Sequence, residues 1–258
     1  MKHLSTPPKL LLFDLDGTLL DSRKQISPRN LAAIEACRVR GILIGVATAR
    51  GEATCARYVE QIQPDVVISN SGGLVRIHGE IVYSNAFTVE ETIALVRAGT
   101  AEKRGVTVDT AAHSYCNVQL DMSGWNDVEL TDYSEASGFH ERAFKVCIEG
   151  TDIDFAERTA ALVEDCDWLA FSDCDWFKFS RRLNDKGKAL AVLEEAMGIA
   201  PAEIVAFGDD FVDSAMLKAC GVGVAMGNAV DEVKRCADVV IGDNDSDAIA
   251  TFLEGTIL

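Results

Sequence analysis

Two carboxylates lie one residue apart directly after an apolar run near the start of the chain. Residues 10–13 read Leu-Leu-Leu-Phe, and Asp14 and Asp16 follow them, with Gly17 and Thr18 next. Because side chains alternate along a strand, a continuing strand would direct both carboxylates to one side, where like charges repel. A bound cation or an acid–base task would offset that cost. The alternative is a polar junction in which Asp16 and Gly17 form a tight turn.

Three further stretches carry polar residues that could complete a site with these carboxylates. Taken singly, each has an ordinary interpretation as a solvated turn or a surface helix residue. In chain order, however, all four stretches resemble the motifs of the haloacid dehalogenase superfamily of phosphatases, and the segment 224–240 is similar to its Cof-like branch. Members of that branch carry a large cap, of type IIB, between the second and third motifs. The three stretches are Val46-Ala47-Thr48-Ala49-Arg50, Lys186-Gly187 and Gly208-Asp209-Asp210-Phe211-Val212-Asp213.

The resemblance implies a two-step chemistry for the first pair of carboxylates. Asp14 would attack phosphorus and form an aspartyl-phosphate, while Asp16 would protonate the departing alcohol and then activate water. The surroundings of the two groups should therefore push their pKa values apart. The resemblance also implies a magnesium ion held by Asp14, by the main-chain carbonyl of Asp16 and by Asp209, since hard oxygen ligands suit Mg²⁺.

The remaining motif residues are expected around the phosphate and the metal. Thr48 would offer its hydroxyl and Lys186 its charge to the phosphoryl oxygens, with Ala49 beside them. Asp213 is expected to bond a metal-bound water or Lys186, and Asp210 to lie near it, behind the metal ligands. Contacts to the substrate are expected for three other residues, Arg50, Asn70 and Asn228.

Two residues depart from the pattern of the resembled family. Ala49 stands where glycine is usual, and a backbone with negative φ would tolerate it. Val212 stands where asparagine commonly precedes Asp213, so a polar group near the metal is missing. We expect this second departure to weaken metal binding or to slow the reaction.

Apolar strands alternate with helices in two parts of the chain. This alternation predicts an α/β fold with a doubly wound parallel sheet, the Rossmann-like core of the resembled superfamily. Because ligands bind outside the carboxyl ends of such strands, Asp14, Thr48 and Asp209 are expected at one edge. Between the two parts lies a segment in which helices and strands do not alternate, and it predicts an inserted α+β cap domain. The predicted domains are a catalytic core at 1–83 and 183–258 and a substrate-specificity cap at 84–182.

The chain is strongly acidic, with 24 lysine and arginine residues against 41 aspartate and glutamate residues and a net charge of -17. This balance predicts no partnership with nucleic acid or with an anionic membrane. The first apolar run stops at Asp14 and is too short for a signal peptide or a membrane span. Eight cysteines show no metal-binding spacing, which favours reduced, buried thiols. We therefore expect a cytoplasmic protein that is a monomer or a weak homo-oligomer.

These observations predict a magnesium-dependent phosphatase that hydrolyses a small phosphorylated metabolite, such as a sugar phosphate or a similar monoester. A phosphomutase would use the same motifs, and the identity of the product separates the two activities. A catalytically weak homologue that serves as a binding or regulatory module is the other alternative, and Val212 is its only support. The acidic cap favours a substrate with one phosphate and a neutral or amine-bearing remainder.

Overall fold

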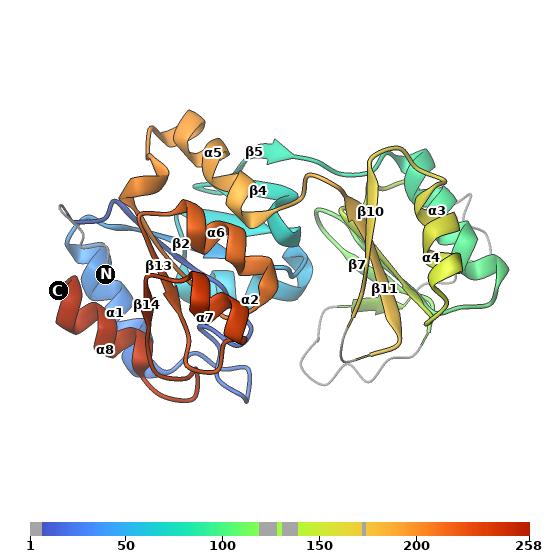
Figure 1. The fold of residues 1–258 in the computed structure, drawn as a ribbon. Coiled ribbons are helices and arrows are strands. Elements are labelled where there is room, and N and C mark those ends of the chain that lie inside the picture. The colour runs from blue at the N-terminus through green and yellow to red at the C-terminus, as the bar shows by residue number, and fades with distance from the viewer. Residues whose placement is uncertain (1–6, 119–127, 131–138, 172–173) are drawn as a thin grey trace. The chain divides into compact units, whose positions relative to one another are not determined.

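The computed structural model describes residues 7–118, 128–130, 139–171 and 174–258 (Figure 1). The chain divides into two compact units, and each is described by itself. The first unit, called the core below, comprises Met1–Ala49, Tyr58–Tyr83 and Asp185–Leu258. The second unit, called the cap, comprises Arg50–Arg57 and Ser84–Asn184. The sequence-based boundaries assign Arg50–Arg57 to the core instead.

The core contains an eight-stranded sheet in the order β14-β13-β12-β1-β2-β3-β4-β5. Neighbouring strands are parallel from β14 to β3, which confirms the predicted α/β fold with a parallel sheet. The central strands are apolar throughout because both faces of the sheet are covered. The strands span Leu10–Phe13 (β1), Leu43–Ala47 (β2), Val66–Ser69 (β3), Leu74–Ile77 (β4), Glu80–Ser84 (β5), Ile204–Gly208 (β12), Val222–Ala225 (β13) and Val239–Val240 (β14).

Strands β4 and β5 extend the sheet in a way that the sequence analysis does not foresee. β4 runs antiparallel to β3, and β5 pairs with β4 at the edge of the sheet. Two residues, His78 and Gly79, connect β4 and β5, and both have positive φ angles of 48° and 86°. Two-residue hairpin turns need such angles, but histidine in the first position is a weak signal for one.

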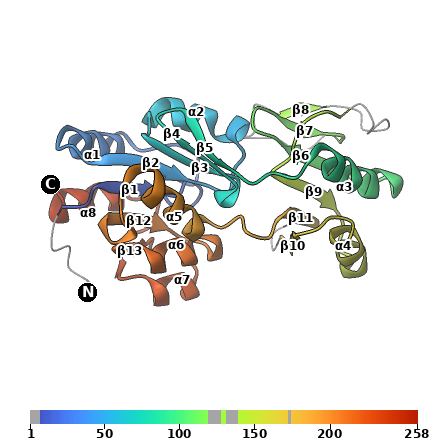
Figure 2. The same cartoon turned by 90° about the horizontal axis from the view of Figure 1, so that it is seen from above.

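Helices cover both faces of the core sheet. In Figure 2, α6 and α7 lie on one side of this sheet and α1 on the other. A buried cluster that includes Leu12, Leu193 and Leu217 joins the sheet to α5 and α6. Phe207 stacks on Phe13 and meets Phe252 of α8 edge to face. The helices of the core span Pro28–Val39 (α1), Lys186–Met197 (α5), Ser214–Ala219 (α6), Asp231–Cys236 (α7) and Ala248–Thr256 (α8). Helix α2 (Glu52–Ile62) is divided between the two units.

The cap is built on a six-stranded sheet in the order β10-β11-β9-β6-β7-β8. Neighbouring strands are antiparallel except β7 and β8, which are parallel. Helices α3 and α4 pack on the sheet through a buried cluster that includes Leu95, Val146, Phe155 and Phe179. These elements span Val89–Ala101 (α3), Val106–Asp109 (β6), Ser114–Cys116 (β7), Val128–Leu130 (β8), Lys145–Glu149 (β9), Ile153–Ala160 (α4), Cys166–Ala170 (β10) and Trp176–Arg181 (β11).

Side chains fix the chain where the cap segment begins and ends. The Asn85 Nδ2 donates to Asn184 Oδ1 at 2.8 Å, and Asn184 Nδ2 donates to the Asn85 carbonyl at 3.3 Å. Arg142 donates to the carbonyls of Ala86 and Phe87, at 3.2 and 3.3 Å.

Among the helices that the described residues form, none is both long and apolar enough to cross a bilayer.

Candidate active site

Three predicted site residues follow three neighbouring strands of the core sheet. Asp14 comes directly after β1, Thr48 after β2 and Asp209 after β12. Because β1 is parallel to both of its neighbours, the carboxyl ends of these strands meet at one edge. The Asp14 amide continues the ladder by donating to the Phe207 carbonyl at 3.0 Å. The sheet therefore brings these three side chains to the same edge.

The turn after Asp14 packs tightly against Asp209. Gly17 has a φ of +79°, and a Cβ atom there would lie 2.2 Å from Asp209 Oδ2. The hydroxyl of Thr18 donates to Asp209 Oδ1 at 2.7 Å, and Asn228 Nδ2 donates to the Gly17 carbonyl at 2.8 Å. Glycine is thus required at position 17 both by the backbone angle and by the space.

Lys186 is the cation of the site and is only 1% exposed. It is the first residue of α5, whose N-terminus Asp185 caps by accepting from the backbone amides of Gly187 and Lys188. The Lys186 Nζ lies 2.6 Å from Asp14 Oδ1 and 2.6 Å from Asp213 Oδ1. The other oxygen of Asp213 accepts from the amides of Asp209 and Asp210, at 3.0 and 3.1 Å. Asp213 therefore fixes both Lys186 and the loop that carries Asp209.

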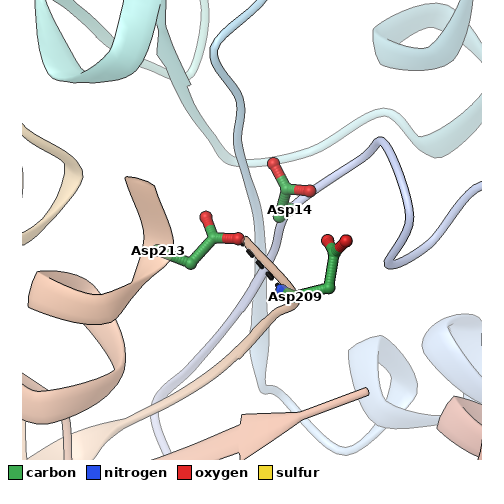
Figure 3. Close-up of side chains that lie close together, drawn as sticks. All are labelled: Asp14, Asp209 and Asp213. Atoms are coloured by element: carbon green, nitrogen blue, oxygen red, sulfur yellow. Dashed lines mark hydrogen bonds between the residues drawn. The ribbon is translucent and has the colours of Figure 1, made fainter. Parts of the chain in front are cut away.

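The carboxylates outnumber this lysine. Oxygens of Asp14, Asp209 and Asp213 lie within 4.8 Å of one another (Figure 3). Burial raises the pKa of Asp14 well above its ordinary value, and the charges of Asp213 and Asp209 add to this effect although Lys186 opposes it. Burial likewise raises the pKa of Asp209 to about 6. For Lys186, burial disfavours the charged form, but the carboxylates outweigh it and raise its pKa. A further cation would stabilise the ionised carboxylates.

The donor atoms fit a divalent cation. Both oxygens of Asp213 already accept hydrogen bonds, so this residue is suited to hold its neighbours rather than a metal. Asp14 and Asp209 each retain one carboxylate oxygen that accepts none of the hydrogen bonds described above. Carboxylate oxygens are hard ligands of the kind that Mg²⁺ prefers, and a divalent charge would offset the excess of negative charge.

Asp16 lies in the turn beyond Asp14 and is partly exposed. Its Oδ1 is 2.7 Å from the Nζ of Lys24, a residue with a positive φ of 59°. The carbonyl of Lys24 accepts from the hydroxyl of Tyr58 at 3.1 Å, and Tyr58 is buried. Tyr58 therefore fixes the backbone of the turn that carries Lys24.

Thr48 and Asn70 lie on connected loops. Thr48 is buried, and its carbonyl accepts from the Ser71 amide at 3.0 Å. Asn70 follows β3 and is also buried. Ala49, beside Thr48, is not among the residues with positive φ, so the absence of the usual glycine leaves no backbone strain there.

The other predicted residues have different surroundings. Arg50 is buried and groups with the cap, and its Nη1 donates to the Thr54 carbonyl at 3.0 Å. Asp210 is exposed and accepts from the Phe211 amide at 2.7 Å. Asn228 holds the Gly17 carbonyl, as described above, and its Oδ1 accepts from the Asn244 amide at 3.0 Å. The carboxylate of Asp210 therefore lies outside the cluster of Asp14, Asp209 and Asp213.

Sequence reasoning missed two residues that touch the site. Thr18 belongs to the first motif, and its position after the glycine could have identified it as a partner for a nearby carboxylate. Lys24 lies eight positions beyond Asp16, and no periodicity connects the two. Only the path of the turn brings their charges together.

Comparisons with known proteins extend over almost the whole chain. A sequence model of the haloacid dehalogenase-like hydrolases matches residues 11–253. The chain is similar to the pyridoxal phosphate phosphatase of Escherichia coli, with 29% identity covering 95% of this chain and 97% of that protein. It is also similar to a phosphoglycolate phosphatase of Methanopyrus kandleri, with 28% identity covering 95% of each. Among solved structures, a haloacid dehalogenase-like hydrolase from Bacteroides thetaiotaomicron matches with a TM-score of 0.86 at 25% identity, covering 96% of this chain and 99% of that one.

Proposed function

The chain belongs to the haloacid dehalogenase-like hydrolases, as its four motifs predict, and on this premise we propose that it is a magnesium-dependent phosphatase of a small phosphorylated metabolite. That it is an enzyme of the phosphatase class follows from the family and from its similarity to named phosphatases over nearly all of its length. The observation that carries the finer proposal is the buried Lys186, which contacts Asp14 beside the third carboxylate, Asp209.

Asp14 acts as the nucleophile in this proposal. One of its carboxylate oxygens forms a bond to phosphorus while the bond from phosphorus to the leaving oxygen breaks. Asp16, protonated once its ion pair with Lys24 has opened, gives its proton to that oxygen, so that the leaving group departs as an alcohol. In the second step Asp16 removes a proton from water, whose oxygen attacks the phosphorus of the aspartyl-phosphate. Phosphate leaves, and the Asp14 carboxylate is restored.

The surrounding residues prepare this reaction electrostatically. Lys186 holds the Asp14 carboxylate in place and offers positive charge close to the transferred group. Thr48 offers a hydroxyl at the same edge of the sheet. Asp14, Asp209 and the carbonyl of Asp16 would hold a magnesium ion, which would supply positive charge to the phosphoryl oxygens. Asp213 keeps Lys186 and the loop of Asp209 in place through both of its oxygens.

The similarities to known phosphatases support a class of substrate and not a single compound. One relative is named for pyridoxal phosphate and another for phosphoglycolate, so similar chains act on phosphate esters with different leaving groups. We therefore propose a small phosphate monoester as the substrate. The cap residues within 84–182 are proposed to select among such esters, because the core already contains the groups that act on phosphate.

The decisive experiment measures phosphate release from phenyl phosphate and from a panel of phosphorylated metabolites. The purified protein is assayed with magnesium, after chelation, and after magnesium is restored. We expect turnover only when magnesium is present. Turnover that survives chelation would contradict the metal dependence. If a sugar phosphate were converted to an isomeric sugar phosphate without release of phosphate, the protein would be a phosphomutase instead.

A further inference from the structure

A fixed turn in the core presents one lysine to the first motif. Lys24 has a left-handed backbone with a φ of 59°. Its amide donates to the Asp21 carbonyl at 2.9 Å, and its carbonyl accepts from the hydroxyl of Tyr58 at 3.1 Å. The Asp21 carboxylate holds the same turn by accepting from the amides of Arg23 and Gln25, at 2.9 and 2.8 Å. The backbone of Lys24 is therefore held in place, whereas its side chain is 46% exposed.

The tip of this lysine contacts the side chain that the proposed reaction needs at the leaving group. The Lys24 Nζ lies 2.7 Å from Oδ1 of Asp16, whose side chain is 37% exposed. Lys186 is buried against Asp14, but Lys24 is accessible to solvent and hence to a substrate. A lysine has a long, flexible stem, so its ammonium can move while its backbone stays fixed. Lys24 thus offers an accessible cation beside Asp16.

The ion pair must open before Asp16 can act. Asp16 has to reach the oxygen of the leaving group, and a carboxylate oxygen that is bound to an ammonium is not available to it. An exposed ion pair of this kind is weak enough to open. Once it has opened, the Lys24 ammonium has lost its carboxylate on the side of the site where the leaving group lies. A carboxylate carried by the substrate would replace Asp16 as the partner of this ammonium.

We propose that Lys24 binds a carboxylate on the leaving group and releases Asp16 by doing so. The preferred substrates are then phosphate monoesters of hydroxy acids whose carboxylate lies close to the ester oxygen. Lys24 acts as a specificity-determining residue in the core, in addition to the selection proposed for the cap. This inference rests on the proposed phosphatase function and narrows it to a class of leaving group.

The acidity of the chain does not decide against such substrates. A net charge of -17 disfavours acidic molecules in general. Salt, however, screens charges that are separated by more than about 10 Å, so a cation in direct contact with the substrate has the larger effect. The local cation therefore outweighs the overall charge at this position.

Substrate pairs that differ by one carboxylate test the proposal. 2-Phosphoglycerate carries a carboxylate where glycerol 2-phosphate carries a hydroxymethyl group, and O-phosphoserine carries one that phosphoethanolamine lacks. With magnesium present, we expect the wild-type enzyme to prefer the acidic ester of at least one pair by about fivefold or more in kcat/KM. In Lys24→Met this preference should fall to about twofold or less.

Phenyl phosphate separates this role from a general one. It carries no carboxylate, so for this ester Lys24→Met only removes the ion pair that engages Asp16. We expect its kcat to rise by about two- to fivefold, which is the strength of an exposed ion pair. Because a loss of folding would lower the turnover of every ester, opposite changes for acidic and neutral esters identify a role in specificity.

Two further variants are matched controls. Arg23→Met removes the same charge one residue away, but Arg23 pairs with Asp21 at 3.0 Å, so this variant should keep the preference. Lys24→Arg keeps a cation at the position and should retain most of the preference. The two variants together distinguish contact with the substrate from a change in net charge.

The inference is overturned by any of three results. The first is a wild-type enzyme that hydrolyses both members of each pair without a preference for the acidic ester. The second is a preference that persists in Lys24→Met. The third is a loss of activity in Lys24→Met that is equal for all esters, phenyl phosphate included, which would assign Lys24 to the common chemistry or to the fold. A wild-type protein that hydrolyses no phosphate ester would instead refute the proposed function itself, and this inference with it.

Discussion

The core and the cap each pair a lysine with a buried aspartate, but the two clusters differ in charge balance. In the cap, the Lys145 Nζ lies 2.6 Å from Asp109 Oδ2, and the hydroxyl of Ser114 donates to Asp109 Oδ1 at 2.6 Å. The charge of Arg50 also acts on Lys145, so the carboxylate there lies among cationic side chains. In the core, Lys186 contacts two carboxylates at the same distance of 2.6 Å, and Asp209 brings a third close to them.

The difference indicates which cluster serves the fold and which serves chemistry. A carboxylate that cationic side chains already match needs no further cation, and its value lies in the geometry that it fixes. A cluster with excess negative charge is costly in the absence of a cation and gains when one binds. Burial, and to a smaller extent the neighbouring carboxylates, raises the pKa of Asp14 and of Asp209, as is typical of functional sites. Four experiments test this contrast.

The largest effect is expected from Asp14→Asn. This change removes the proposed nucleophile and one proposed metal ligand while it keeps the shape of the side chain. We expect kcat for phenyl phosphate to fall by several orders of magnitude. The melting temperature of the metal-free protein should not decrease, since one buried negative charge is lost. Substantial remaining activity would contradict the assigned role of Asp14.

Replacing each of these lysines by methionine compares the two clusters directly. Lys186→Met leaves two buried carboxylates without their cation, and we expect it to lower the free energy of unfolding by about 3–5 kcal/mol. Lys145→Met should cost less, because its ion pair is partly exposed and Arg50 remains nearby. Only Lys186→Met should abolish hydrolysis of phenyl phosphate. Lys145→Met should keep kcat for this ester within a few-fold, measured at a temperature where circular dichroism shows that the variant is folded. Equal loss of activity in the two folded variants would remove the distinction between the clusters.

The pH dependence of stability tests the raised pKa of Asp209. The pKa of Asp209 is about 6 in the folded protein, against an ordinary value of 3.8, so the folded protein binds the proton more tightly. The resulting stabilisation is complete below about pH 4 and is lost as the pH rises through 6. In metal-free protein this contribution is on the order of 3 kcal/mol. Asp209→Asn should flatten this part of the curve in urea unfolding at pH 4 to 7. An unchanged slope would show that Asp209 is not the titrating group.

The smallest effect concerns Val212, which is half-buried in the turn before Asp213. Val212→Asn would place a polar group beside the loop of Asp209. We expect it to tighten magnesium binding by about tenfold, the usual effect of residues that orient metal ligands. Titration of activity against magnesium in both proteins measures this effect. Unchanged or weaker metal dependence would mean that this position does not face the metal.

The sequence predicts the parts of this molecule that depend on periodic patterns. Apolar strands followed by polar residues identify β1, β2 and β12. Parallel pairing then brings Asp14, Thr48 and Asp209 to one edge. These features follow from local propensity and from the rules of parallel sheets.

The features that escaped prediction depend on turns and on contacts between distant segments. The ion pair between Lys24 and Asp16 forms from a turn in which Lys24 itself has a left-handed backbone. No glycine at this position indicates such a turn. Ser71 adopts such an angle as well, and the β4–β5 hairpin turns at His78. Backbone angles of this kind are imposed by surrounding packing and therefore leave little trace in the residues themselves.

The packing of Gly17 against Asp209 has a consequence for directed evolution. A side chain at position 17 would collide with Asp209 and would have to adopt an unfavourable backbone angle, so a library selected only for stability will retain glycine there. The same selection, carried out without metal, will accumulate Asp209→Asn, since the ionised carboxylate costs free energy in that state. Residues that survive selection for stability alone thus mark the scaffold, while residues that disappear mark the catalytic apparatus that the scaffold was selected to carry.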